Sequence, residues 1–127
     1  MCGIVGAFDL RTRPLVAEQL IGRMTDTIAH RGPDDHGVYV SPGKNIGLGF
    51  RRLSIVDLSA AGHQPMSNDA CVAAGLGVAQ GKHLNSRVRV VFNGEIYNHD
   101  SLRSELEGLG HQYRSRSDTE ALLHGYE

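Results

Sequence analysis

The 127-residue sequence has no tryptophan, only two cysteines and almost no net charge. Cys2 and Cys71 are too few for a disulfide framework and do not form a paired metal motif, so a reducing compartment is the default expectation. A formal net charge of −1 gives no electrostatic reason to expect nucleic acid or an anionic membrane as a partner. The hydrophobic content of 40% is ordinary for a globular chain, and the length suits one domain.

Targeting and metal signals are missing as well. The N-terminus lacks the basic and apolar regions of a signal peptide, and no apolar run approaches the length of a membrane span. The seven histidines lack His-x-x-x-His spacing and no Cys-x-x-Cys supports them, so no metal site is expected. No Gly-x-Ser-x-Gly indicates a serine nucleophile. These absences predict a soluble, cytoplasmic protein.

The most informative residue is Cys2, directly behind the initiator methionine. If Met1 is removed, Cys2 carries a thiol and a free α-amine on the same carbon, and such groups titrate near neutral pH. The α-amine can then take the thiol proton, which makes an activated nucleophile with its own base. Gly3 leaves room for a substrate to approach the backbone. For this position alone, the alternative is a small apolar residue opening an ordinary strand, because free cysteines are usually buried and inert.

Hydrophobic periodicity predicts alternating strands and helices. Leu20, Ile21, Met24 and Ile28 have the spacing of an amphipathic helix, and Ser117–Glu120 has the spacing of a capping box. The predicted segments are a buried strand 4–8, helix 16–29, turn 30–35, strands 38–40 and 46–50, an extended or turn segment 52–57, loop 60–66, strand 88–92, a helix from Asn98 or Asp100 closed by Gly108 and Gly110, strand 111–114, and a helix opening at 117–120. No clear βαβ repeat is present, so the predicted class is α+β.

Residues 70–87 stand apart from these patterned segments. They are rich in Gly and Ala, have no period, and contain neither Gly-x-Gly-x-x-Gly nor Gly-Lys-Ser/Thr, so a phosphate-binding loop is not expected. This stretch is predicted to be a long surface loop or insertion without a chemical role. Cys71, at its start, is expected to be a non-catalytic thiol.

If Cys2 attacks a carboxamide, the chemistry needs donors for an oxyanion and charges for an amino-acid substrate. Asn93-Gly94, at the end of a predicted strand, offers a side-chain amide and a backbone N–H. Arg52 can bind a carboxylate with two parallel hydrogen bonds, and Asp118 or Glu95 can bind an ammonium group. The alternatives are a plain hairpin turn for Asn-Gly and ordinary surface charges for the other three.

Six motifs occur in a fixed order along the chain. They are Met-Cys-Gly-Ile-Val-Gly (1–6), His-Arg-Gly-Pro-Asp (30–34), Arg-Leu-Ser-Ile-Val-Asp (52–57), Ala-Gly-His-Gln-Pro-Met (61–66), Asn-Gly-Glu-Ile-Tyr-Asn-His (93–99) and Ser-Asp-Thr-Glu (117–120). Together they resemble the glutaminase domain of glutamine-dependent asparagine synthetases, a class II glutamine amidotransferase domain of the N-terminal-nucleophile hydrolase type. The resemblance covers the whole chain apart from about 70–87.

The resemblance implies a fold, an activity and a set of site residues. The family fold is an αββα sandwich of two mainly antiparallel sheets. The implied reaction is hydrolysis of L-glutamine to glutamate and ammonia through a γ-glutamyl thioester. The implied roles are nucleophile and base for Cys2, oxyanion hole for Asn93 and Gly94, carboxylate binding for Arg52, contact with the α-amino end for Glu95 and Asp118, and support of the cysteine site for Arg31.

The resemblance also implies a partner for this chain. Ammonia would pass to an ATP-dependent synthetase domain, and ATP and Mg²⁺ are expected only there, so no cofactor is expected in residues 1–127. The chain corresponds to roughly the first two-thirds of the family domain, so later strands are expected outside it. Open strand edges of such a piece could pair in a homodimer. Two alternatives are kept: an amidotransferase with a different ammonia acceptor, and a non-catalytic structural or interaction fragment.

Overall fold

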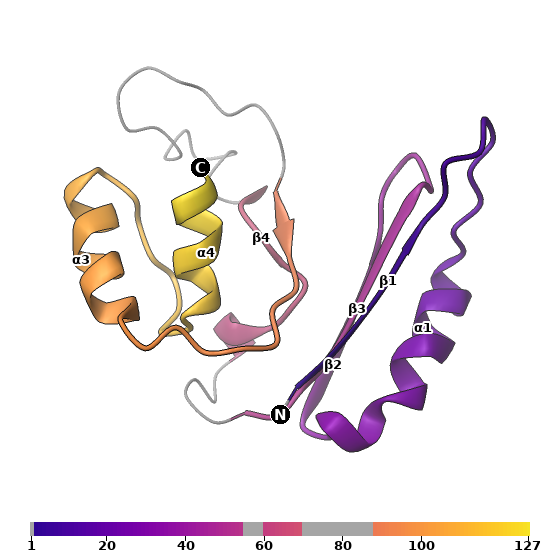
Figure 1. Cartoon of the computed structure of the whole chain (residues 1–127), viewed down its shortest axis with the longest axis horizontal. Coiled ribbons are helices and arrows are strands. Elements are labelled where there is room, and N and C mark those ends of the chain that lie inside the picture. The colour runs from indigo at the N-terminus through magenta and orange to yellow at the C-terminus, as the bar shows by residue number, and fades with distance from the viewer. Residues whose placement is uncertain (1, 55–59, 70–87) are drawn as a thin grey trace. The chain divides into compact units, whose positions relative to one another are not determined.

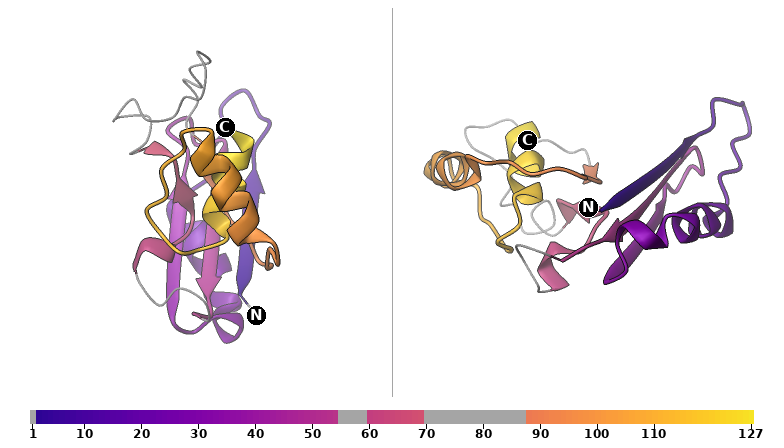
Figure 2. Two further views of the ribbon diagram at one scale, coloured as in Figure 1. Left: turned by 90° about the vertical axis from the view of Figure 1, so that its left-hand side faces the viewer. Right: turned by 60° about the horizontal axis from the view of Figure 1, so that its bottom comes forward.

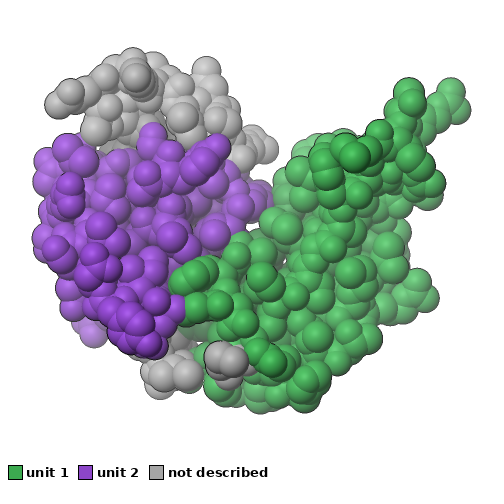
Figure 3. Space-filling view, viewed as in Figure 1, with its two compact units in different colours: residues 1–55, 63–65, 91–94 green, residues 56–62, 66–90, 95–127 purple. Residues whose placement is uncertain are grey.

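The computed structural model describes residues 2–54, 60–69 and 88–127. The chain divides into two compact units, coloured separately in Figure 3. Unit 1 comprises residues 1–55, 63–65 and 91–94, and unit 2 comprises 56–62, 66–90 and 95–127. The predicted loop insertion at 70–87 and Cys71 within it lie outside the described residues.

Unit 1 is built on a three-stranded antiparallel sheet, shown in Figure 1. Its strands are β1 (Gly3–Phe8), β2 (Asp35–Val40) and β3 (Ile46–Arg52), in the spatial order β1-β3-β2. Strands β2 and β3 form a hairpin in which the Ser41 hydroxyl accepts hydrogen bonds from the Asn45 and Ile46 backbone N–H groups. The central strand β3 pairs Gly3 with Arg51 on one side and Asp35 with Arg52 on the other. This pairing brings the start of β1, the start of β2 and the end of β3 to the same end of the sheet.

Helix α1 (Glu18–Thr27) covers one face of this sheet, as Figure 2 shows. Two glycines of β3 allow the close approach: a Cβ at Gly47 would lie 2.5 Å from Cγ1 of Ile21, and one at Gly49 would lie 2.1 Å from Oγ1 of Thr25. Ile21 is fully buried there. The chain continues into a 3₁₀ turn, η1 (Ala29–Arg31), before β2.

The first strand is present but is not buried throughout. Ile4 is 48% exposed and Phe8 is 64% exposed, whereas Gly3 is buried. Because neighbouring residues of a strand point to opposite faces, only the face with Gly3, Val5 and Ala7 packs under α1. The prediction of a buried first strand is therefore wrong for its other face. The first helix is shorter than predicted, and β2 begins at Asp35, inside the predicted turn.

Unit 2 contains two helices, a two-stranded sheet and a short 3₁₀ turn. Its elements are η2 (Ala60–Gly62), β4 (Met66–Ser67), β5 (Arg89–Val90), α3 (His99–Gly108) and α4 (Thr119–Tyr126). Helix α3 ends as predicted near its two glycines: Gly110 has φ +100°, and the Gly110 and His111 N–H groups donate to the carbonyls of Glu107 and Leu106. These two bonds form the Schellman motif, which favours glycine at the left-handed position.

Three local predictions in unit 2 are wrong. Residues 111–114 are not a strand, because the backbone N–H of Arg114 donates to the Glu120 carboxylate instead of a strand partner. The predicted strand 88–92 is reduced to Arg89–Val90, which pair with the two residues of β4, and the first of these, Met66, falls inside the predicted loop 60–66. The capping box does not form, since the Ser117 N–H donates to the Ser115 hydroxyl rather than to Glu120.

The described residues therefore form a mixed α/β structure with small antiparallel sheets and three α-helices. This composition agrees with the predicted α+β class. The αββα sandwich remains a prediction. No helix in the described part of the chain is long and apolar enough to cross a membrane.

Candidate active site

The Cys2 thiol lies directly before β1 and next to the backbone that follows β3. Its Sγ accepts a hydrogen bond from the Leu53 N–H at 3.4 Å and lies 3.7 Å from the Leu53 carbonyl oxygen. Cys2 is half-buried. The thiol is thus held by a main-chain group 51 residues away in the sequence, and it keeps access to solvent.

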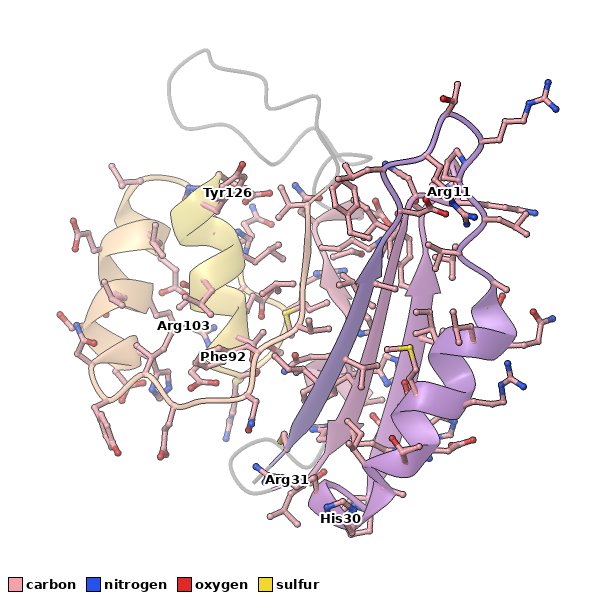
Figure 4. The ribbon with its side chains drawn as sticks, turned by 45° about the vertical axis from the view of Figure 1, so that its right-hand side comes forward. Arg11, His30, Arg31, Phe92, Arg103 and Tyr126 are labelled. Atoms are coloured by element: carbon pink, nitrogen blue, oxygen red, sulfur yellow. The ribbon has the colours of Figure 1, made fainter. Side chains whose placement is uncertain are left out.

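Gly3 brings the start of β1 against η1. A Cβ at Gly3 would lie 2.7 Å from Cδ1 of Ile28 and 3.2 Å from Cβ of Arg31. Arg31, which Figure 4 labels, therefore lies beside Gly3, the residue that follows Cys2. The predicted role of Arg31 in supporting the cysteine site stays a prediction.

Arg52 is the last residue of β3 and is only 8% exposed. It lies directly across the sheet from Asp35, and its carbonyl accepts a hydrogen bond from the Asp34 N–H at 3.0 Å. Arg52 is therefore a buried cation at the end of the sheet, and its role in binding a carboxylate stays a prediction.

Asp34 is a residue of this site that the sequence reasoning did not single out. Its carboxylate accepts a hydrogen bond from the Ser54 N–H at 2.7 Å. A Cβ at Gly32 would lie 2.5 Å from the backbone of Arg51 and of Arg52. The His-Arg-Gly-Pro-Asp turn is therefore packed on the backbone that carries Arg52 and Leu53. The available signal was the position of Asp34 within the His-Arg-Gly-Pro-Asp motif.

Asn93 and Gly94 are exposed and follow Phe92 in an irregular segment of unit 1. They do not connect two strands of a hairpin among the described residues. A Cβ at Gly94 would lie 2.6 Å from Cζ of Phe92, so the aromatic ring lies against the glycine backbone.

Glu95 and Asp118 belong to unit 2 and are linked through the chain between them. The Asp118 carboxylate accepts a hydrogen bond from the Ile96 N–H at 2.8 Å, and Ile96 directly follows the exposed Glu95. This hydrogen bond, between residues 22 positions apart in the sequence, brings the two acidic residues into one region of unit 2. The other predicted site residues belong to unit 1: Cys2, Arg31, Arg52, Asn93 and Gly94.

A second polar cluster surrounds helix α4, where a metal was not expected. His111, His124 and Glu127 offer ligand atoms that all lie within 4.8 Å of one another. Two imidazoles and one carboxylate form a donor set that Zn²⁺ accepts. The same atoms also pair among themselves, since Glu127 Oε2 lies 2.8 Å from Nδ1 of His124 and 3.4 Å from Nδ1 of His111. The cluster is thus already an internal ion-pair network.

Glu120 extends this network to the loop before α4. Its carboxylate accepts hydrogen bonds from the N–H groups of Arg114 and Ser115 and from the Ser115 hydroxyl. Burial favours the protonated acid, but hydrogen bonds from His124, Ser115 and the backbone outweigh it and lower the pKa of Glu120 to about 2. Burial opposes protonation of His124, and the carboxylates of Glu120 and Glu127 outweigh it and raise the His124 pKa.

Comparison with known proteins places the whole chain in one family. The family described as "Glutamine amidotransferase domain" matches residues 1–127. The chain belongs to this family. The predicted resemblance is confirmed, and the glutamine amidotransferase domain is of the kind found in asparagine synthetases.

Similar relatives come from bacteria and plants. The chain is 40% identical over 126 residues to asparagine synthetase (glutamine-hydrolyzing) 3 of Bacillus subtilis. It is 37% identical over 127 residues to asparagine synthetase B (glutamine-hydrolyzing) of Escherichia coli, and 32% identical over 127 residues to asparagine synthetase (glutamine-hydrolyzing) 1 of Arabidopsis thaliana. These alignments cover 99%, 100% and 100% of this chain, but only 18%, 20% and 18% of the relatives.

Proposed function

We propose that this amidotransferase domain hydrolyses L-glutamine with Cys2 as an N-terminal nucleophile. The observation that carries the proposal is the half-buried Cys2 thiol, held by the Leu53 N–H at the end of the sheet where Arg52 is buried. A nucleophile, a cation and a pair of oxyanion donors in one compact unit are the parts that acyl transfer requires. The family membership supports glutamine as the substrate.

The proposed reaction has two covalent steps. After removal of Met1, the Cys2 α-amine takes the thiol proton, and the thiolate adds to the γ-carboxamide carbon of glutamine. The Asn93 side-chain amide and the Gly94 N–H stabilise the oxyanion that forms. The proton then goes to the departing nitrogen, the C–N bond breaks, and ammonia leaves a γ-glutamyl thioester. Water attacks the thioester with the α-amine as base, which releases glutamate and restores the thiol.

Charged side chains would hold the amino-acid end of glutamine during both steps. Arg52 would bind the α-carboxylate with two parallel hydrogen bonds, and Glu95 and Asp118 would contact the α-ammonium group. Arg31 would support the cysteine site through its position beside Gly3. These four roles, like those of Cys2, Asn93 and Gly94, are proposals.

We further propose that the ammonia serves an asparagine-synthetase-type amidation in a partner domain. The support is that similar relatives are named as glutamine-hydrolyzing asparagine synthetases, and this chain spans about a fifth of their length. ATP and Mg²⁺ would bind in that domain, outside residues 1–127. A reducing cytoplasm suits a catalytic thiol. β1 and β2 are the outer strands of the described three-stranded sheet, and pairing along such an edge would allow a homodimer.

Cys2→Ala tests the nucleophile in the full protein that contains this chain. We expect it to abolish glutamate release from glutamine while synthesis from free ammonia continues, because the two activities lie in separate domains. Cys71→Ala is the matched control and should keep glutamine hydrolysis. The N-terminal mass must show that Met1 is absent, since an acylated nitrogen cannot act as the base. A wild-type rate in Cys2→Ala would refute the assignment.

A further inference from the structure

We propose that Gln64 is a positioning residue for the oxyanion hole, which it holds in place through the backbone of Phe92. This inference rests on the proposed function, because it assigns the Asn93–Gly94 segment to oxyanion stabilisation. Gln64 lies in the Ala-Gly-His-Gln-Pro-Met motif, which the proposed reaction does not otherwise use. Gln64, Phe92, Asn93 and Gly94 all belong to unit 1.

The side-chain amide of Gln64 bonds to both main-chain polar groups of Phe92. The Phe92 N–H donates to Gln64 Oε1 at 2.7 Å, and Gln64 Nε2 donates to the Phe92 carbonyl at 3.5 Å. The first distance is that of a strong bond and the second is near the outer limit. Together the two contacts replace those that a neighbouring strand would make, at a point where β5 has already ended.

Gln64 is itself held firmly against the sheet. It is 5% exposed, and a Cβ at Gly37 would lie 1.9 Å from the Gln64 carbonyl oxygen. The neighbouring His63 pairs through Nδ1 with the Asp35 carboxylate at 2.8 Å. Asp35 and Gly37 are residues of β2, so the sheet that carries Arg52 also anchors Gln64.

Phe92 transmits this anchoring to the oxyanion donors. Asn93 follows it directly, and the Phe92 ring lies against Gly94, where a Cβ would approach it to 2.6 Å. Donors act on an oxyanion only when they lie about 2.7–3.1 Å from its position. A misplacement of about 1 Å in an active site can cost about 10²-fold in rate. Loss of the Gln64 contacts should therefore slow chemistry without removing any group that touches the substrate.

The test variant is Gln64→Met in the full protein with Met1 removed. Methionine is close to glutamine in size but offers neither contact to Phe92. We expect kcat for glutamine hydrolysis to fall about 10- to 100-fold while KM stays within about twofold. Gln19→Met makes the same substitution at an exposed position of α1 and should leave both constants unchanged.

Combination with Asn93→Ala distinguishes positioning from general stability. If Gln64 acts through the oxyanion donors, Gln64→Met should add little to the loss already caused by Asn93→Ala. Rates are expressed per active site titrated by alkylation of Cys2, so that a reduced folded fraction does not count as slower chemistry. An unchanged kcat, a raised KM alone, or losses that multiply in the double variant would each overturn the inference.

These outcomes separate the two proposals. If the wild-type protein releases no glutamate from glutamine, or if Cys2→Ala retains the activity, the proposed function itself fails. If the wild-type protein is active, Cys2→Ala is inactive and Gln64→Met matches Gln19→Met, only the role of Gln64 fails.

Discussion

Glu120→Gln should destabilise unit 2 by about 2–4 kcal/mol. The Glu120 carboxylate is 2% exposed and accepts three hydrogen bonds from Arg114 and Ser115. Glutamine replaces one oxygen with an NH₂ donor, so at least one N–H or O–H loses its acceptor, at a cost of about 1–3 kcal/mol. The buried His124, whose Nε2 lies 3.5 Å from Glu120, also loses part of its counter-charge.

Urea unfolding followed by tyrosine fluorescence measures this effect, because Tyr97, Tyr113 and Tyr126 belong to unit 2. Glu107→Gln is the matched control. Its exposed carboxylate pairs with Arg103 one helical turn away at 2.9 Å, and such pairs contribute under about 1 kcal/mol. If Glu120→Gln costs no more than Glu107→Gln, the buried network does not stabilise the fold.

The same network gives a pH dependence with a definite sign. The pKa of Glu120 is lowered from its usual 4.5 to about 2, so its contribution to the free energy of unfolding is present above pH 4.5 and is lost as the pH falls toward 2. His124 has a raised pKa, so its contribution is present below its usual pKa of 6.5 and is lost as the pH rises through the raised value. Urea midpoints measured between pH 5 and 3 should therefore fall less steeply in Glu120→Gln than in the wild type. Equal slopes would contradict the assignment.

Substitutions at three further positions probe the site and the sheet. Arg52→Ala should raise KM for glutamine more than it lowers kcat. Arg52→Lys should restore only part of the affinity, because lysine lacks the planar guanidinium fork. An unchanged KM in steady-state assays of Arg52→Ala would remove Arg52 from the substrate site. Asn93→Ala should lower kcat by about 10²–10³ with a smaller change in KM, and a kcat equal to wild type would exclude it as an oxyanion donor. Gly49→Ala should destabilise unit 1 by about 1–3 kcal/mol in urea unfolding, because its Cβ would lie 2.1 Å from Thr25 Oγ1, and an unchanged midpoint would contradict that packing.

Periodic apolar residues were sufficient to predict α1 and α3, and short apolar runs predicted most of the three-stranded sheet. Helix α1 forms where Leu20, Ile21 and Met24 predicted it, yet the buried face is shared by Ile21 and the polar Thr25, while Leu20 is 41% exposed. Thr25 is tolerated in the core because its hydroxyl donates to the Ile21 carbonyl at 2.8 Å. Apolar periodicity predicts that a helix forms, but it does not predict which polar residue can be buried because its side chain makes a hydrogen bond inside the protein.

Strand predictions failed where side chains took over the hydrogen bonds of the backbone. Residues 88–92 have strong strand propensity, but the Phe92 N–H bonds to the Gln64 amide instead of another strand. Residues 111–114 fail for the same reason, since the Arg114 N–H bonds to Glu120. Such contacts join residues that are 28 and 6 positions apart, and no local propensity contains them.

The predicted site residues came from ordered motifs, and the structure adds the contacts between those motifs. The positions of Cys2, Arg52 and Asn93 could be taken from the sequence. The Leu53 N–H that holds the thiol could not, because it is a main-chain group that any residue could supply. The participation of Gln64 was equally hidden, since its partner is the backbone of Phe92.

Gly3 has a consequence for the fidelity of strand pairing. A slip of β1 by one residue would turn Ile4 and Phe8 toward α1, where even a single Cβ at position 3 would approach Ile28 to 2.7 Å. The same slip would move the Cys2 thiol about 3.3 Å along the sheet. A shift of that size would break the hydrogen bond from the Leu53 N–H, which is already 3.4 Å long. The close packing at Gly3 thus opposes a one-residue slip and favours the alignment in which the Cys2 thiol meets its main-chain donor.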